Sequence, residues 1–186
     1  KPEDRERYLR GELVEPAKPI VFYIENSTPY RWRKYIKQGI EDWQVAFERA
    51  GFKNAIIAKE ITDSMTVDMD DVNYSVLTYA ASTKANAMGP SILDPRSGEI
   101  LEADIMWWHN VLNMLQEWIT VQTGTVRPEA RGIKLSDELM GDAMRFVACH
   151  EVGHSLGLRH NMMGSWAFPT DSLRSKSFTD RMNSTS

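Results

Sequence analysis

Cysteine is nearly absent from this sequence, because Cys149 is the single thiol among 186 residues and an internal disulfide is therefore excluded. No apolar run approaches the roughly 20 residues of a membrane span. Residues 1–5 include acidic as well as basic side chains, which is not typical of the start of a signal peptide. There is no basic stripe either, since 22 Lys and Arg are mixed with 26 Asp and Glu along the chain. We therefore expect no transmembrane segment and no nucleic-acid partner.

The remaining composition is that of one ordinary soluble domain, with 42% apolar residues and a net charge of −4. A chain of this length buries roughly two-thirds of its unfolded surface, so its core needs no disulfide. Residues 1–18 are charged, contain prolines and show no steady period, and we expect a lead-in or linker there. We expect a monomeric piece of a larger protein, with the fold itself beginning at Pro19.

The first regular elements form a strand–helix–strand unit. Residues 20–24 are β-branched or aromatic throughout, which predicts a strand covered on both faces by flanking helices. Thr28 and Pro29 predict a helix start, and apolar residues at helical spacing predict one helix up to Gly51. Residues 55–58 follow as a second strand, which we expect to run parallel to the first.

Three carboxylates, Asp68, Asp70 and Asp71, lie close together in the stretch from residue 63 to residue 73. Carboxylates at this spacing could hold calcium, but the stretch lacks the glycine and the distal glutamate of an EF-hand loop. We therefore expect a solvated loop.

The next elements are a strand over residues 76–81 and two strands over 85–93 and 100–107. Residues 94–98 combine Asp, Pro and Gly in the order of a tight turn, so the last two strands should run antiparallel. Apolar spacing predicts a further helix over residues 111–119.

A mostly buried helix is expected from residue 139 to residue 156, with Ser136 as its N-cap. Residues 150–160 of this region read HEVGHSLGLRH and hold three of the four histidines. His150 and His154 lie one helical turn apart and within roughly 40° of each other, so both imidazoles can reach one ion. The pattern including Gly157 and His160 should arise by chance in roughly one chain of this length in 10⁵.

The spacing also assigns roles to the residues around the two histidines. Glu151 is rotated to one side, where it can contact a water on the metal and act as a general base. Gly157 can take the left-handed conformation that ends a helix, so that His160 returns as a third ligand. Three imidazoles leave a fourth position for water, which is typical of a catalytic zinc site.

The motif HEVGHSLGLRH resembles the HExxHxxGxxH signature of the metzincin zinc peptidases, and most closely the Met-zincin-type domains of large secreted or surface bacterial proteins. The resemblance implies Zn²⁺ held by His150, His154 and His160, with Glu151 as catalytic base. It implies an α/β (α+β) fold with a twisted mixed five-stranded sheet, an antiparallel edge strand, a long N-terminal helix and an active-site helix. Residues 19–160 would form the N-terminal subdomain and residues 161–186 the start of a short or truncated C-terminal subdomain.

In metzincins the antiparallel edge strand borders the cleft and pairs with an extended substrate, and Ala87, Met88 and Gly89 occupy the corresponding place. The resemblance also implies a Met-turn beneath the metal. Met162 and Met163 follow His160 too closely to supply it, so we expect the chain to end before this turn, with Met182 as the weaker alternative.

The sequence therefore predicts a zinc-dependent endopeptidase with a peptide or protein substrate, located by resemblance in a secreted, periplasmic or cell-surface setting. The alternative is a catalytically silent zinc-containing module that binds peptide or glycan within a larger surface protein. His109 has no partner at ligand spacing and Cys149 is rotated about 100° from His150, so we expect neither to act at the site.

Overall fold

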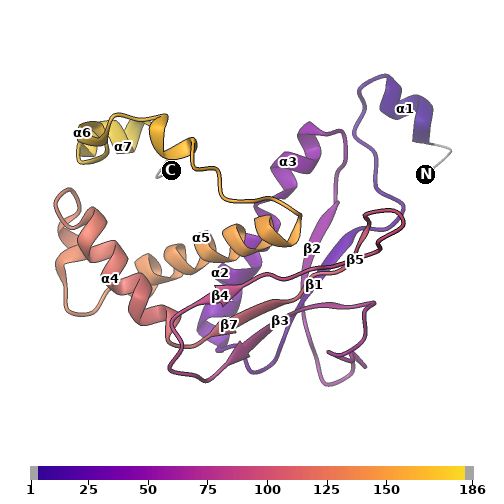
Figure 1. Ribbon diagram of the computed structural model, residues 1–186, viewed down its shortest axis with the longest axis horizontal. Coiled ribbons are helices and arrows are strands. Elements are labelled where there is room, and N and C mark those ends of the chain that lie inside the picture. Colours follow the sequence, from indigo (N-terminus) through magenta and orange to yellow (C-terminus); the bar gives the residue numbers. More distant parts are fainter. Residues whose placement is uncertain (1–3, 183–186) are drawn as a thin grey trace.

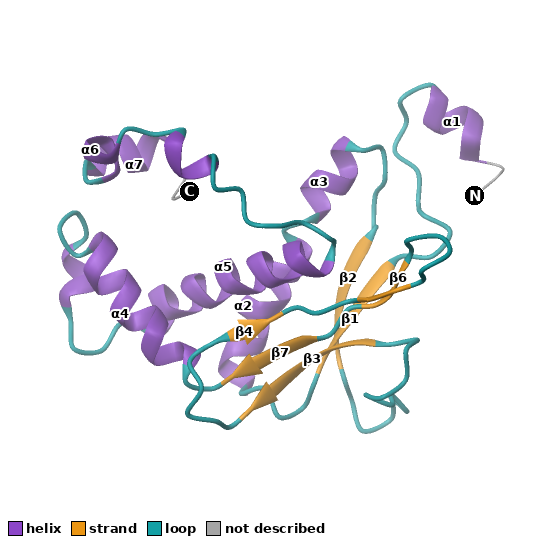
Figure 2. Cartoon of the chain, viewed as in Figure 1, coloured by secondary structure: helices purple, strands orange, loops and turns teal. Residues whose placement is uncertain are grey.

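The computed structural model describes residues 4–182, whose helices and strands are shown in Figures 1 and 2. The helices are α1 (Arg5–Leu9), α2 (Tyr30–Glu41), α3 (Gln44–Arg49), α4 (Val111–Thr123), α5 (Asp137–Ser155), α6 (Thr170–Leu173) and α7 (Lys176–Met182). The strands are β1 (Ile20–Ile24), β2 (Ile56–Glu60), β3 (Ser75–Ala80), β4 (Ala87–Met88), β5 (Ile92–Leu93), β6 (Ile100–Glu102) and β7 (Ile105–Trp108). Two short 3₁₀ helices are η2 (Pro128–Arg131) and η3 (Gly164–Trp166).

The main sheet has five strands in the order β2-β1-β3-β7-β4. Strand β1 pairs in parallel with β2 and β3, and β3 pairs in parallel with β7. Strand β4 at the edge is antiparallel to β7, with Ala87 opposite Trp107 and Met88 opposite Met106. The predicted fold class, a mixed five-stranded sheet with an antiparallel edge strand, is confirmed.

Helices α2 and α5 pack along each other and cover the sheet, α2 over β1 and β2, and α5 over β4 and β7 (Figure 1). Their close approach depends on Gly39 of α2, where a Cβ would lie 2.3 Å from the Arg145 carbonyl oxygen. This packing corrects the expectation that helices flank β1 on both faces. Phe22 and Ile24 are buried, whereas Tyr23 between them is only partly buried.

The long helix predicted to end at Gly51 is two helices, because the chain turns at Asp42 and Trp43 between α2 and α3. Both turn residues bind α5. Asp42 accepts two hydrogen bonds from the Arg145 guanidinium at 2.6 and 2.7 Å, and the Trp43 indole reaches the helix backbone. Helical periodicity cannot reveal this turn, since the interactions that hold it are long-range in sequence.

The two predicted strands over 85–93 and 100–107 are each divided between two sheets. Their N- and C-terminal parts, β4 and β7, belong to the main sheet, whereas β5 and β6 form a separate antiparallel pair. The antiparallel relation is confirmed in both pairs, and the turn closes as predicted, with the Gly98 amide donating to the Asp94 carbonyl at 2.7 Å. The first strand divides at Gly89 and Pro90, where proline has no amide to donate to a ladder.

The two ends of the described chain hold short helices. The predicted lead-in contains α1, and its Val14 is buried and pairs with Phe52. After α5, helices α6 and α7 pack against each other, with the Phe168 and Phe178 rings edge to face at 5.8 Å. Of the helices in residues 4–182, none is both long and apolar enough to cross a bilayer. The division into a lead-in and two subdomains stays a prediction.

Candidate metal centre

Helix α5 carries the predicted site, and its N-terminus forms as the sequence indicates. The Ser136 hydroxyl accepts a hydrogen bond from the Leu139 amide at 3.1 Å, which caps one of the free amides of the first turn. One side of the helix is packed into the core, and its buried apolar residues are Met140, Met144, Val147, Ala148 and Val152. Burial of this side fixes which residues face outward.

The C-terminus of α5 is a Schellman turn, a bend closed by two backbone hydrogen bonds around a left-handed residue. Gly157 has φ +92°, its amide donates to the His154 carbonyl at 2.9 Å, and the Leu158 amide donates to the Gly153 carbonyl at 3.0 Å. The chain therefore turns sharply after the helix. This bend brings His160 back to the last turn of α5.

The rings of His150, His154 and His160 converge. Their Nε2 atoms form a nearly equilateral triangle, with His154 at 3.1 Å from each of the other two and His150 at 3.2 Å from His160. Among the described residues, these are the only three or more His, Cys, Asp or Glu side chains whose ligand atoms all lie within 4.8 Å of one another. Zn–N bonds of about 2.0–2.1 Å at a tetrahedral angle place ligand nitrogens roughly 3.3 Å apart, so the triangle fits such an ion.

The tautomer of His154 supports the same interpretation. Its Nδ1 lies 2.9 Å from the Leu158 carbonyl oxygen, which can only accept, so Nδ1 carries the proton and Nε2 presents a lone pair. Burial is the larger of two effects that lower the pKa of His150, and the positive charges of His154 and His160 are the smaller one. Both favour the neutral form of His150. Neutral imidazoles that face one another across 3.2 Å or less are stabilised by a cation between them.

Glu151 lies between His150 and His154 in the sequence and is buried, with 8% of its surface exposed. Burial raises the pKa of its carboxyl group, and the neighbouring His154 and His160 partly offset this effect. Its carboxylate is not part of the cluster of ligand atoms within 4.8 Å. Glu151 therefore does not belong to the group of converging ligand atoms, and its carboxyl group binds a proton more readily than an exposed glutamate does.

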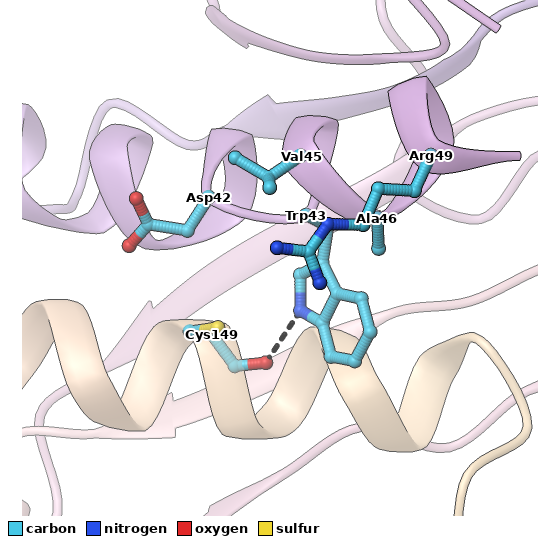
Figure 3. A pocket seen from close by; sticks show the side chains of 6 residues that line it. All are labelled: Asp42, Trp43, Val45, Ala46, Arg49 and Cys149. Carbon is cyan, nitrogen blue, oxygen red and sulfur yellow. Dashed lines mark hydrogen bonds between the residues drawn. The ribbon is translucent and has the colours of Figure 1, made fainter. Parts of the chain in front are cut away.

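Trp43 contacts α5 through a hydrogen bond to the backbone of Cys149, the residue before His150 (Figure 3). Its indole Nε1 donates to the Cys149 carbonyl at 2.8 Å, and a Cβ at Gly153 would lie 2.9 Å from its ring. Beside it, between α3 and α5, is an open hollow of about 450 Å³. The Cys149 thiol lines this hollow, and burial raises its pKa, which keeps it protonated. Trp43 was not expected beside the histidine motif, because its spacing in the sequence is that of an ordinary core residue.

Two further residues, Gly89 and Phe146, lie next to residues of the histidine motif on α5. Gly89, directly after β4, contacts α5 so closely that a Cβ there would lie 2.6 Å from the Glu151 carbonyl oxygen and 2.8 Å from the Ser155 hydroxyl. Phe146 is half-exposed, and its ring centroid is 6.3 Å from that of His150. The four-residue spacing between Phe146 and His150 is the signal that could have indicated this neighbour.

The remaining histidine and the methionines lie elsewhere. Nδ1 of His109 is 2.8 Å from the Tyr79 hydroxyl, and His109 is outside the histidine cluster, as expected. Met162 and Met163 are largely exposed after the bend, and Met182 lies at the end of α7. The expectation that the chain ends before the Met-turn, with Met182 as the weaker alternative, stays a prediction.

Comparison with protein families concerns the C-terminal part of the chain. Residues 132–186 match the family described as Met-zincin. The Met-zincin stretch contains α5, the bend and all three converging histidines, so the predicted resemblance is confirmed there. The match supports a metallopeptidase-like domain in which three histidines can hold a metal ion. No curated protein and no solved structure matches the chain.

Proposed function

We propose that the protein is a zinc-dependent endopeptidase that cleaves an extended peptide, with His150, His154 and His160 as metal ligands. The observation that carries this proposal is the triangle of three Nε2 atoms at 3.1–3.2 Å beside a buried carboxylate. When bound, a zinc ion lowers the pKa of a coordinated water to about 7 and polarises a peptide carbonyl.

Glu151 is the general base in this proposal. Its carboxylate accepts a proton from the attacking water and then delivers it to the nitrogen of the leaving amine. Burial raises the pKa of Glu151 from that of an exposed glutamate, which brings it closer to neutral pH and suits a group that must both take and return a proton. The hydrogen bond from His154 to Leu158 keeps that ligand ring in orientation during turnover.

The edge strand provides the surface for the substrate. Strand β4 pairs with β7 on one side only, so its other edge can bind a peptide in extended conformation. Ala87, Met88 and Gly89 would contribute backbone groups to this pairing. Because Gly89 touches the backbone of Glu151, the peptide would lie alongside the general base.

The test is digestion of a mixed peptide library by the zinc-loaded protein, with the Glu151→Gln variant as matched control. Gln is nearly isosteric but cannot accept the proton, so we expect both proteins to bind one zinc and cleavage to fall by at least about 10²-fold in the variant. Equal cleavage by both proteins would remove Glu151 from the mechanism. Binding of peptides without any cleavage would favour the alternative, a silent zinc-containing binding module.

By the same resemblance we propose action outside the cytoplasm, in a secreted, periplasmic or cell-surface location. Fractionation of cells producing the full-length protein tests this, and recovery only with cytoplasmic markers would contradict it.

A further inference from the structure

Trp43 contacts one side of the turn of α5 that carries His150. Its indole Nε1 donates to the Cys149 carbonyl at 2.8 Å, and a Cβ at Gly153 would lie 2.9 Å from its ring (Figure 3 shows the hydrogen bond). Cys149 and Gly153 are four residues apart, so they lie on one face of the helix, one turn apart. One side chain from outside the helix therefore contacts both ends of this turn.

Strand β4 contacts the same turn from the opposite side. A Cβ at Gly89 would lie 2.6 Å from the Glu151 carbonyl oxygen and 2.8 Å from the Ser155 hydroxyl. At 100° per residue, Cys149 and Glu151 are roughly 200° apart around the helix axis. The turn is therefore held between Trp43 and the edge strand, and the two candidate ligands on the helix project from the face between these contacts.

The contacts support the end of α5, where helices fray most readily. The helix ends at Ser155, so its last two turns carry both His150 and His154. Gly153 makes an isolated helix less stable by about 1 kcal/mol than alanine would. Its lack of a side chain, however, leaves room for the Trp43 ring. Local helix stability is therefore low at this turn, and the contact with Trp43 offsets the loss.

We propose that Trp43 is a positioning residue of the metal centre, which acts through the Cys149 carbonyl to hold His150 and His154 at helical spacing before a metal binds. The inference rests on the proposed function in one respect, the assignment of these histidines as zinc ligands. Without the indole N–H, the turn would open in a fraction of the molecules. Zinc affinity would then fall in proportion to the fraction that keeps the helical spacing.

The experiment compares Trp43→Phe with Trp32→Phe, because both substitutions remove an indole N–H and keep an aromatic ring. Trp32 is buried in α2, and its Nε1 has no hydrogen-bond partner within residues 4–182, so its removal breaks no such bond. Each zinc-loaded protein is titrated with a chromogenic chelator. We expect zinc affinity to fall about 3–10-fold in Trp43→Phe, which is the effect of one hydrogen bond, and to stay unchanged in Trp32→Phe.

Cobalt provides a second measurement, since the visible absorption of bound Co²⁺ depends on its coordination geometry. We expect the spectrum of the cobalt-loaded protein to change in Trp43→Phe and to stay native in Trp32→Phe. A loss of overall stability alone would not produce this difference between two folded variants.

Gly153→Ala tests the same contact without altering Trp43. Alanine favours the helix locally, but its Cβ would displace the indole ring, so zinc affinity should fall even though helix propensity rises. In the Trp43→Phe background the same substitution should cause little further loss, because the smaller ring leaves room for the methyl group.

The proposal is overturned if Trp43→Phe binds zinc as tightly as the native protein, or if Trp32→Phe loses the same affinity. It is also overturned if Gly153→Ala keeps native zinc affinity. None of these measurements uses a substrate. Absence of peptide cleavage by the zinc-loaded native protein would therefore count against the endopeptidase and not against the role of Trp43.

Discussion

The Nδ1–H of His154 donates to the carbonyl of Leu158 at 2.9 Å, so this ring on the helix is oriented by the bend that follows it. The bend in turn depends on Gly157 at φ +92°. A single residue without a side chain therefore links the end of α5 to the orientation of His154 and to the position of His160.

The first prediction concerns this bend. Gly157→Ala should lower the free energy of unfolding by about 1–2 kcal/mol, because alanine is strained at this φ, and should also weaken zinc binding. Gly98→Ala is the matched control, since Gly98 has φ +74° and equally open surroundings in a turn remote from the histidines. We expect G98A to lose similar stability with unchanged zinc affinity. Equal zinc affinity in both variants would contradict the role of the bend.

The second prediction distinguishes the histidines. His160→Ala should reduce zinc affinity by at least about 10-fold, because it removes one of three ligands. His109→Ala, which removes the histidine bound to Tyr79, should leave one zinc per chain with unchanged affinity. Competition with a chromogenic chelator measures both. A loss of zinc in H109A alone would refute the assignment of ligands.

The third prediction concerns the close contact between β4 and α5. Gly89→Ala should displace the edge strand, because its Cβ would lie 2.6 Å from backbone at Glu151, and cleavage of peptides should fall more than zinc binding. The control is Gly11→Ala, whose Cβ would meet nothing within 4 Å, although its positive φ carries a cost in stability. Comparison of kcat/KM and zinc content tests this. Native kcat/KM in a folded G89A variant would argue against substrate pairing at β4.

The fourth prediction is the pH dependence of metal retention. Protons compete with metal for the imidazoles, and the pKa of His150 lies below its ordinary value because of burial and the two neighbouring histidines. The lowered pKa keeps His150 neutral to a lower pH than an ordinary histidine, so zinc should stay bound at neutral pH and dissociate as the pH falls below the ordinary histidine range. Zinc content after dialysis at stepped pH measures this. Release already at about pH 7 would be inconsistent with the lowered pKa.

The candidate site could be predicted from the sequence because it is local. The N-cap at Ser136, the helical spacing of His150 and His154, and the glycine that ends the helix all lie within 25 residues, where short-range rules of helix geometry apply. The parallel pairing of β1 and β2 could also be predicted from the sequence, since a strand, a helix and a strand follow one another directly.

Features that depend on distant partners could not be predicted in the same way. The turn at Asp42 and Trp43 is held by α5, more than 100 positions away. The break between β6 and β7 is held by side-chain bonds from Ser75 and Asp104, which replace ladder hydrogen bonds. The residues that hold the turn and the break lie far away in the sequence and do not change the local pattern of apolar residues. One long helix and one continuous strand were therefore expected.

The three converging histidines do not share the same support. His150 and His154 lie on a helix packed along α2, whereas His160 follows an exposed bend. An arriving ion would thus find two donors on one packed helix and a third whose place depends on the backbone after that helix. A substitution in residues 157–160 that left α5 intact would then weaken the grip on the ion without unfolding the element that carries the other two donors.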